Sequence, residues 1–150
     1  MDNIKSLVTN RKATFEYEIL QKLEAGIELR GTEAKSIRLG QVNISESHCR
    51  ISNDFQAYLV NMNVAPYAFG NRVNHEAKRD RRLLLHRNEI RRLYGQSREK
   101  GLTLIPLKVY LSKGKIKVEI ALVKGKKLFD KRETLKNKDA QIEIARGLRD

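Results

Sequence analysis

The chain has 150 residues, 40% of them hydrophobic, so it is long enough to bury one core and too apolar to be wholly disordered. Lys and Arg number 31 against 18 Asp and Glu, and the net charge of +13 predicts a polyanionic partner, either nucleic acid or an anionic membrane. No apolar run approaches the roughly 20 residues that span a bilayer. The single cysteine, Cys49, excludes an internal disulfide and is typical of a reducing cytosol. We therefore expect a cytoplasmic protein without a membrane anchor.

The predicted elements begin with two strands. Apolar residues at every second position over residues 14–19 have the period of a strand with one buried face. Residues 25–29 repeat this alternation after a break at Glu24. A short helix is expected to follow, capped by Thr32 and ended by Gly40.

The middle of the chain is predicted to hold a pair of strands, a basic loop and a helix. The two strands flank the polar turn at residues 52–54, and the second covers residues 56–63. The polar stretch over residues 70–82 has little to bury and is predicted to be a long loop. Asn88 is expected to cap an amphipathic helix that ends near Gly101.

The last predicted elements are a hairpin and a charged tail. Strands over residues 104–111 and 115–123 flank a turn at residues 112–114. Residues 125–150 carry too few apolar side chains to offset an ordering entropy of about 1–2 kcal/mol per residue. We therefore expect residues 1–124 to form one barrel domain. The tail is expected to be disordered in the free protein and to fold on a partner.

Several short antiparallel strands with a few helices are typical of a small closed β-barrel. The OB-fold is the commonest barrel of this size that binds oligonucleotides. We therefore predict a mainly β protein, an OB-like closed antiparallel barrel with a few short helices and a flexible basic C-terminal tail. The pattern by itself leaves closure open, since it indicates only a small α+β barrel or sheet.

Candidate catalytic groups are sparse in the sequence. The three histidines show no metal-ligand spacing, either with one another or with Cys49. His75, Glu76 and Asp80 could in principle serve a nuclease, but their neighbours are four basic residues, a pattern that favours phosphate binding. The chain also lacks a phosphate-cradling glycine loop. We predict no enzymatic activity, no metal and no small cofactor.

One basic tract runs through the predicted loop and into the following helix. Guanidinium groups suit phosphate because their donors form a planar fork and stay charged at any cellular pH. Glu89 and Glu99 are too few to balance the tract, so RNA binding is favoured over a merely solvated helix. The tract consists of Arg72, Lys78, Arg79, Arg81, Arg82, Arg87, Arg91 and Arg92.

Two further residues have more than one interpretation. An acid such as Glu24 is repelled by phosphates but can accept hydrogen bonds from base amines, and on its own it is better explained as a surface acid at a strand edge. Phe129 lies in a basic segment with little to bury, which is a suitable place for an aromatic ring that stacks on a base. Packing of Phe129 against the barrel is an equally good explanation.

Six segments form an ordered set from about residue 10 to the C-terminus. They are Asn10-Arg11-Lys12-Ala13, Glu24-Ala25-Gly26-Ile27, Gly31-Thr32-Glu33-Ala34-Lys35-Ser36-Ile37-Arg38, Arg81-Arg82-Leu83-Leu84-Leu85-His86, Ile105-Pro106-Leu107, and Gly125-Lys126-Lys127 through Asp130-Lys131-Arg132. Together they resemble the SsrA-binding protein family (small protein B), the bacterial partners of transfer-messenger RNA in ribosome rescue. A single segment is weak support, whereas the ordered set is highly specific.

The resemblance implies an OB-like barrel that binds the tRNA-like domain of transfer-messenger RNA and delivers it to stalled ribosomes for trans-translation. It also implies that Glu24 touches this RNA, with Leu85 and His86 beside it in the interface. The family often has asparagine at the position of His86. The candidate RNA-binding residues are therefore Glu24, Lys35, Arg38, Lys78, Arg79, Arg81, Arg82, Leu85 and His86.

For the tail, the resemblance implies a helix in the vacant mRNA channel, next to the decoding centre of the small ribosomal subunit. Phe129 matches the residue that stacks on a ribosomal RNA base. The candidate tail residues are Lys126, Lys127, Phe129, Asp130, Lys131 and Arg132. The expected partners are thus transfer-messenger RNA and the ribosome, for a protein expected to be monomeric. The alternative is a general RNA chaperone or a ribosome-associated basic protein.

Overall fold

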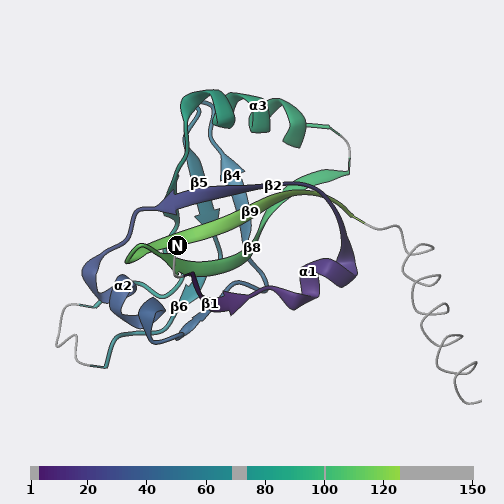
Figure 1. Cartoon of the computed structure of the whole chain (residues 1–150). Coiled ribbons are helices and arrows are strands. Elements are labelled where there is room, and N and C mark those ends of the chain that lie inside the picture. Colours follow the sequence, from purple (N-terminus) through teal and green to yellow (C-terminus); the bar gives the residue numbers. More distant parts are fainter. Residues whose placement is uncertain (1–3, 69–73, 100, 126–150) are drawn as a thin grey trace, which may run out of the picture.

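The computed structural model of the chain describes residues 4–68, 74–99 and 101–125 (Figure 1). The predicted tail residues from Lys126 to Arg132 lie outside the described residues, as does Arg72. The elements in chain order are β1 (Lys5–Thr9), α1 (Arg11–Glu16), β2 (Tyr17–Ile27), α2 (Gly31–Arg38), β3 (Val42–Asn43), β4 (His48–Ile51), β5 (Ala57–Val60), β6 (Asn63–Val64), β7 (Arg81–Leu84), α3 (Arg87–Ser97), β8 (Leu102–Ser112) and β9 (Lys115–Gly125).

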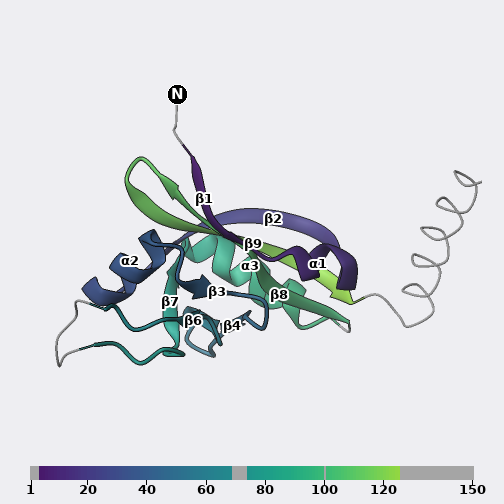
Figure 2. The same cartoon turned by 90° about the horizontal axis from the view of Figure 1, so that it is seen from below.

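The strands form one large antiparallel sheet in the order β1-β8-β9-β2-β7-β5-β4, with β3 and β6 paired separately. Figure 1 shows α3 at one end of the sheet, where it packs on β8 and β9, and α1 beside β8. In Figure 2, seen from below, the small β3–β6 sheet lies beside α2. The predicted mainly β, antiparallel architecture with a few helices is confirmed.

Closure of the barrel differs from the prediction. Within the described residues, the hydrogen-bonded ladder ends at β1 on one side and at β4 on the other. The sheet curls so that β4 packs close to β8, which brings the two ends together without a continuous ladder. Side-chain packing therefore completes the barrel where backbone hydrogen bonds stop.

The curled sheet encloses one main apolar core. Alternate side chains of its strands point inward, and Leu59, Leu83, Val109 and Val118 are each at most 1% exposed. A second, smaller cluster lies on the other face of β8 and β9 beneath α1, and it consists of Ala13, Ile105, Leu107, Ala121 and Val123. Both faces of β8 and β9 are therefore covered over residues 104–107 and 120–123, where every side chain is buried.

The N-terminal prediction is wrong in one element. Residues 11–16 form helix α1, and the strand that was predicted from residue 14 begins only at Tyr17. It then runs unbroken through Glu24 to Ile27. Phe15 was expected to be buried by a strand but is 41% exposed, because α1 turns Ala13 toward the sheet instead.

The two longer helices lie where they were predicted but begin differently. The backbone N–H of Arg30 donates to Glu33 Oε1 (2.7 Å), and the backbone N–H of His86 donates to Glu89 Oε1 (3.0 Å). Each helix is thus capped by an acid in its own first turn rather than by the expected Thr32 or Asn88. The two predicted hairpins, β4–β5 and β8–β9, are both present.

Candidate nucleic-acid interface

A surface hollow brings together predicted RNA-binding residues from separate parts of the chain. Glu24 comes from β2, Arg82 from β7, and Leu85 and His86 from the connection to α3. The Glu24, Arg82 and His86 side chains are exposed, whereas Leu85 is half-buried and packs on the core. We name this site the Glu24 hollow, and its remaining lining residues are Gly26, Gln56, Leu83, Leu84, Glu89, Ile90 and Lys117.

The hollow exists because two strands meet closely beneath it. Gly26 on β2 pairs with Leu84 on β7, and a Cβ atom at position 26 would lie only 3.2 Å from Leu84 Cβ. Glycine therefore permits this approach and leaves the floor of the hollow open. The cap at His86 then turns the chain from β7 into α3, which places Leu85 and His86 at the rim.

A second hollow adjoins the first and shares Gly26, Leu84 and Lys117 with it. Arg38 of α2 and Lys115 of β9 line this second hollow, and Arg38 Nη2 donates to the carbonyl oxygen of Gly114 (3.0 Å). We call the two hollows together the basic face. Its charged side chains are the cations Arg38, Arg82, Lys115 and Lys117 and the carboxylates Glu24 and Glu89, so the face is net positive.

Of the two carboxylates of the basic face, Glu24 is held by a side-chain hydrogen bond from another strand. The Tyr110 hydroxyl of β8 donates to Glu24 Oε2. Burial raises the pKa of Tyr110, and the hydrogen bond to Glu24 raises it further, so the hydroxyl keeps its proton and remains a donor. The Glu24 carboxylate thus lies in a fixed position among cations, which is an arrangement suited to accepting hydrogen bonds from a ligand that also carries negative charge.

The prediction that Arg81 contacts RNA is wrong for this structure. Its side chain is fully buried, and its Nε donates to Glu33 Oε2 (2.5 Å) while its Nη1 donates to the carbonyl oxygen of Met62 (2.7 Å). Its Nη2 donates to the carbonyl oxygens of Glu76 and Ala77. The guanidinium therefore stabilises the fold.

Arg79 belongs to the same buried cluster. Its Nη2 lies 2.6 Å from Glu33 Oε1, and its side chain is only 25% exposed. Burial by itself raises the pKa of Glu33, but hydrogen bonds from Arg79, the Arg30 backbone and Arg81 outweigh it, so the pKa is lowered and Glu33 stays ionised. We refer to Glu33, Arg79 and Arg81 as the Glu33 cluster.

His75, weighed above as a nuclease residue, has a structural position. It is 7% exposed, its Nδ1 lies 2.9 Å from Thr32 Oγ1, and its Nε2 lies 2.9 Å from the carbonyl oxygen of Val64. Within the described ranges, no group of His, Cys, Asp and Glu side chains could hold a metal ion. His75 and the Glu33 cluster together fasten the segment before β7 to α2.

The remaining predicted residues lie outside the basic face. Lys78 lines a separate shallow hollow beside the β3–β6 sheet. Lys35 is exposed on α2, and its Nζ lies 5.4 Å from the centroid of the Tyr67 ring. Conversely, the sequence did not single out Gly26, Lys117 or Tyr110. Of these three residues, only Lys117 had a signal in the sequence: the alternation of β9 places it, with Lys115, on the polar side of the strand.

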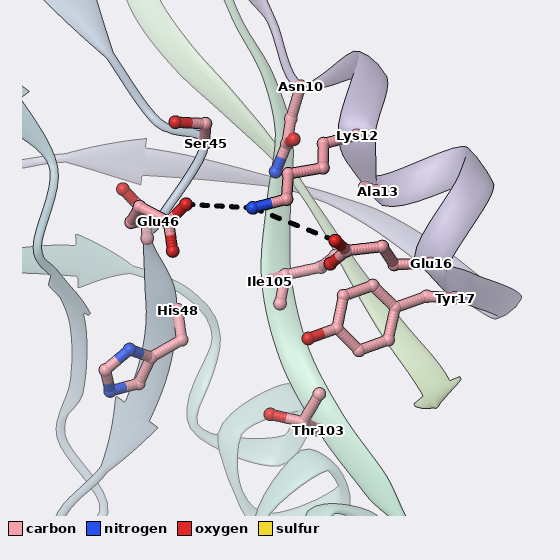
Figure 3. Close-up of a pocket in the computed structure, with 11 residues that line it drawn as sticks. Asn10, Lys12, Ala13, Glu16, Tyr17, Ser45, Glu46, His48, Thr103 and Ile105 are labelled. Carbon is pink, nitrogen blue, oxygen red and sulfur yellow. Dashed lines mark hydrogen bonds and ion pairs between the residues drawn. The ribbon is translucent and has the colours of Figure 1, made fainter. Parts of the chain in front are cut away.

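A further hollow at the α1 end of the sheet has different electrostatics (Figure 3). Lys12 Nζ lies 3.0 Å from Glu46 Oε1 and 3.7 Å from Glu16 Oε1, so two carboxylates surround one ammonium group. Tyr17 and His48 complete its wall. Its acidic balance makes it unsuited to phosphate, which leaves the basic face as the candidate nucleic-acid interface. No helix in the described part of the chain is long and apolar enough to cross a membrane.

Known proteins are similar to this chain over nearly its whole length. The family model described as SmpB protein matches residues 7–150. The chain is 54% identical to the SsrA-binding protein of Caldicellulosiruptor saccharolyticus, over 99% of this chain and 94% of that protein. It is 56% identical to the SsrA-binding protein of Moorella thermoacetica, over 98% and 95% respectively.

A solved structure also resembles this one. It is a chain from the structure reported as "tmRNA-SmpB: a journey to the center of the bacterial ribosome", with a TM-score of 0.70 and 46% sequence identity. The similarity covers 85% of this chain and 93% of that chain. With a family match over nearly its whole length and relatives above 50% identity, the chain belongs to the SmpB protein family.

Proposed function

We propose that this chain binds the tRNA-like domain of transfer-messenger RNA through its basic face and delivers it to stalled ribosomes for trans-translation. Family membership and the similarity to a chain from a structure described as tmRNA-SmpB in the bacterial ribosome support this function. The observation that carries it is the convergence on one hollow of Glu24 with Arg82, Leu85 and His86, which come from a distant part of the sequence.

The basic face divides the recognition of RNA between two kinds of group. Arg38, Arg82 and Lys117 offer charged donors to phosphates, which fixes the position of an RNA without identifying its sequence. Glu24 has only acceptors when ionised, so it favours amino and imino groups on base edges over phosphates. A folded RNA that presents base donors between its phosphates is therefore the ligand that fits.

The proposal extends to the tail, which follows β9. Residues 126–150 are proposed to occupy the decoding centre and the vacant mRNA channel, and so to replace the anticodon arm that a tRNA-like domain lacks. The residues proposed to act there are Lys126, Lys127, Phe129, Asp130, Lys131 and Arg132. We propose that the ribosome performs the chemistry, and that this chain works in the cytoplasm as a monomeric RNA-binding protein without catalytic activity.

Competition binding tests the RNA half of the proposal. The tRNA-like domain should displace unrelated structured RNA from the full-length chain at physiological salt, and equal competition by the two RNAs would favour a general RNA chaperone instead. Glu24→Ala should weaken binding of the tRNA-like domain by about 1–3 kcal/mol. Glu18→Ala removes an exposed acid from the same strand and serves as the matched control.

Truncation tests the tail half of the proposal. A chain that ends at Lys124 keeps every residue of the basic face, so its affinity for the tRNA-like domain should be unchanged. Peptide tagging on stalled ribosomes should be abolished by the same truncation. Loss of both activities together would place the tail in the RNA-binding surface and contradict the proposed division of labour.

A further inference from the structure

The new inference concerns Tyr110, and it rests on the proposed function. We propose that Tyr110 is a positioning residue for RNA recognition. Its hydroxyl holds one oxygen of Glu24 in place, so that the carboxylate is already ordered at the edge of the Glu24 hollow when a base enters it.

The sheet register explains how Tyr110 reaches Glu24. Glu24 on β2 pairs with Glu119 on β9, and Glu119 pairs with Lys108 on β8. Tyr110 lies two residues beyond Lys108, so it is on the same side of β8. Tyr110 is only 4% exposed, whereas Glu24 is exposed, so the ring is fixed by packing and its hydroxyl meets the exposed carboxylate of Glu24.

The surrounding charges make a phenol a more suitable partner than an ammonium group. Glu24 lies directly across from Glu119, an unfavourable pair of like charges. Lys108 Nζ lies 3.9 Å from Glu119 Oε2 and so partly neutralises that second acid. Tyr110 restrains Glu24 without adding a positive charge, and the carboxylate therefore keeps its full charge and the remaining lone pairs for a ligand.

The Glu24 side chain borders two hollows on the surface. It lines the Glu24 hollow on one side, and on the other it lines a shallow hollow with Lys22, Lys108 and Tyr110. Tyr110 lies on this second side, so its hydroxyl anchors one carboxylate oxygen there, and without it the side chain is free to swing between the two hollows. An acceptor that must be ordered when RNA binds costs more side-chain entropy than one that is already ordered, so Tyr110 increases affinity by preorganisation.

The test is a double-mutant cycle in the full-length chain with the tRNA-like domain as ligand. Tyr110→Phe keeps the buried ring and should weaken binding about fivefold, because the Glu24 side chain must then be ordered when the RNA binds. In a Glu24→Ala background, the same substitution should change nothing. Tyr94→Phe is the matched control, because it removes a hydroxyl on α3 that accepts from Arg98 at the end of this helix, away from both hollows, and it should bind like the wild type.

Different outcomes identify which idea fails. If the wild type prefers the tRNA-like domain over unrelated RNA but Tyr110→Phe binds equally well, the positioning role is overturned and the proposed function stands. An equal loss in the Glu24→Ala background would mean that Tyr110 acts through the fold. A wild type without preference overturns both. A readout free of RNA is the ¹³C carboxyl signal of Glu24, which should shift in Tyr110→Phe and stay in place in Tyr94→Phe.

Discussion

Two neighbouring arginines of β7 show how differently the same side chain is used in this protein. Arg81 points inward and is fully buried against Glu33, whereas Arg82 points outward and lines the Glu24 hollow. Each of the two arginines belongs to a site in which a carboxylate lies close to cationic side chains. In the Glu33 cluster two guanidinium groups pair with one buried carboxylate inside the protein, whereas on the basic face the cations outnumber the acids and are open to a ligand.

The inward and outward alternation of side chains along β7, and not the number of basic residues in the segment, decides which of the two arginines is available to bind RNA. A buried ion pair is costly to disrupt because removal of one partner leaves the other charged and desolvated. An exposed cation loses little when it is removed from the free protein, and its effect appears only in the complex. Substitutions in the two sites should therefore separate stability from RNA binding.

The largest effect is expected for Arg81→Ala. It leaves Glu33 without one of its charged partners and removes the donors to the Met62 and Ala77 carbonyls. The free energy of unfolding should fall by about 3–5 kcal/mol, measured by urea denaturation. An exposed arginine would cost less than about 0.5 kcal/mol, and such a small loss would contradict the buried position of Arg81.

Acid should weaken the Glu33 cluster. The pKa of Glu33 is lowered from its ordinary value of 4.5, so the unfolded chain takes up the proton more readily than the folded one. The stability that Glu33 contributes is complete above about pH 4.5 and is lost as the pH falls through its depressed folded pKa. Denaturation midpoints between pH 6 and pH 3 should fall less steeply in Glu33→Gln than in the wild type.

Arg82→Ala should have the opposite profile from Arg81→Ala. Unfolding should change by less than about 0.5 kcal/mol because the side chain is exposed. Binding of the tRNA-like domain should weaken by about 1.5–3 kcal/mol for the loss of a charged hydrogen bond. The slope of log affinity against log salt should become shallower by about 1, as expected for one lost phosphate contact. An unchanged salt slope would exclude Arg82 from the phosphate-binding surface.

Arg50→Ala should have the smallest effect and serves to distinguish location from charge. Arg50 is exposed on β4, 4.9 Å from the centroid of the Tyr58 ring and 3.7 Å from Asp80, but it does not line either hollow of the basic face. Both stability and RNA affinity should change by less than about 0.5 kcal/mol. If affinity fell as much as in Arg82→Ala, net charge would explain binding and the basic face would lose its special role.

Much of the fold could be predicted because the period of the apolar residues was clear. The β8–β9 hairpin has long alternating strands and a two-residue turn at Lys113 and Gly114, both with positive φ. Helix α1 was missed because its buried face is the small Ala13, while the exposed Phe15 imitated the pattern of a strand. A single turn and a half of helix leaves too few residues to show a period of 3.6.

The candidate site was only partly predictable for a related reason. Arg81 is the first residue of β7, and the alternation of this strand places its side chain on the buried face. The polar segment before Arg81 contains no pattern that predicts where the strand begins. The bond between Tyr110 and Glu24 joins residues from separate strands, so it depends on a register that composition does not contain. The family resemblance supplied the roles of Glu24 and His86, whereas only the geometry pointed to Tyr110 and to the close strand approach at Gly26.

Strand β2 has a mechanical consequence for a protein proposed to act at two places at once. Tyr17, at its first residue, pairs with Gly125, the last residue of β9, while Glu24 lies near its other end. The separation along the strand is at most about 24 Å, at about 3.4 Å per residue. Strand β2 is hydrogen-bonded to β9 on one side and to β7 on the other. Its length therefore sets the distance between the start of the tail and the bound RNA.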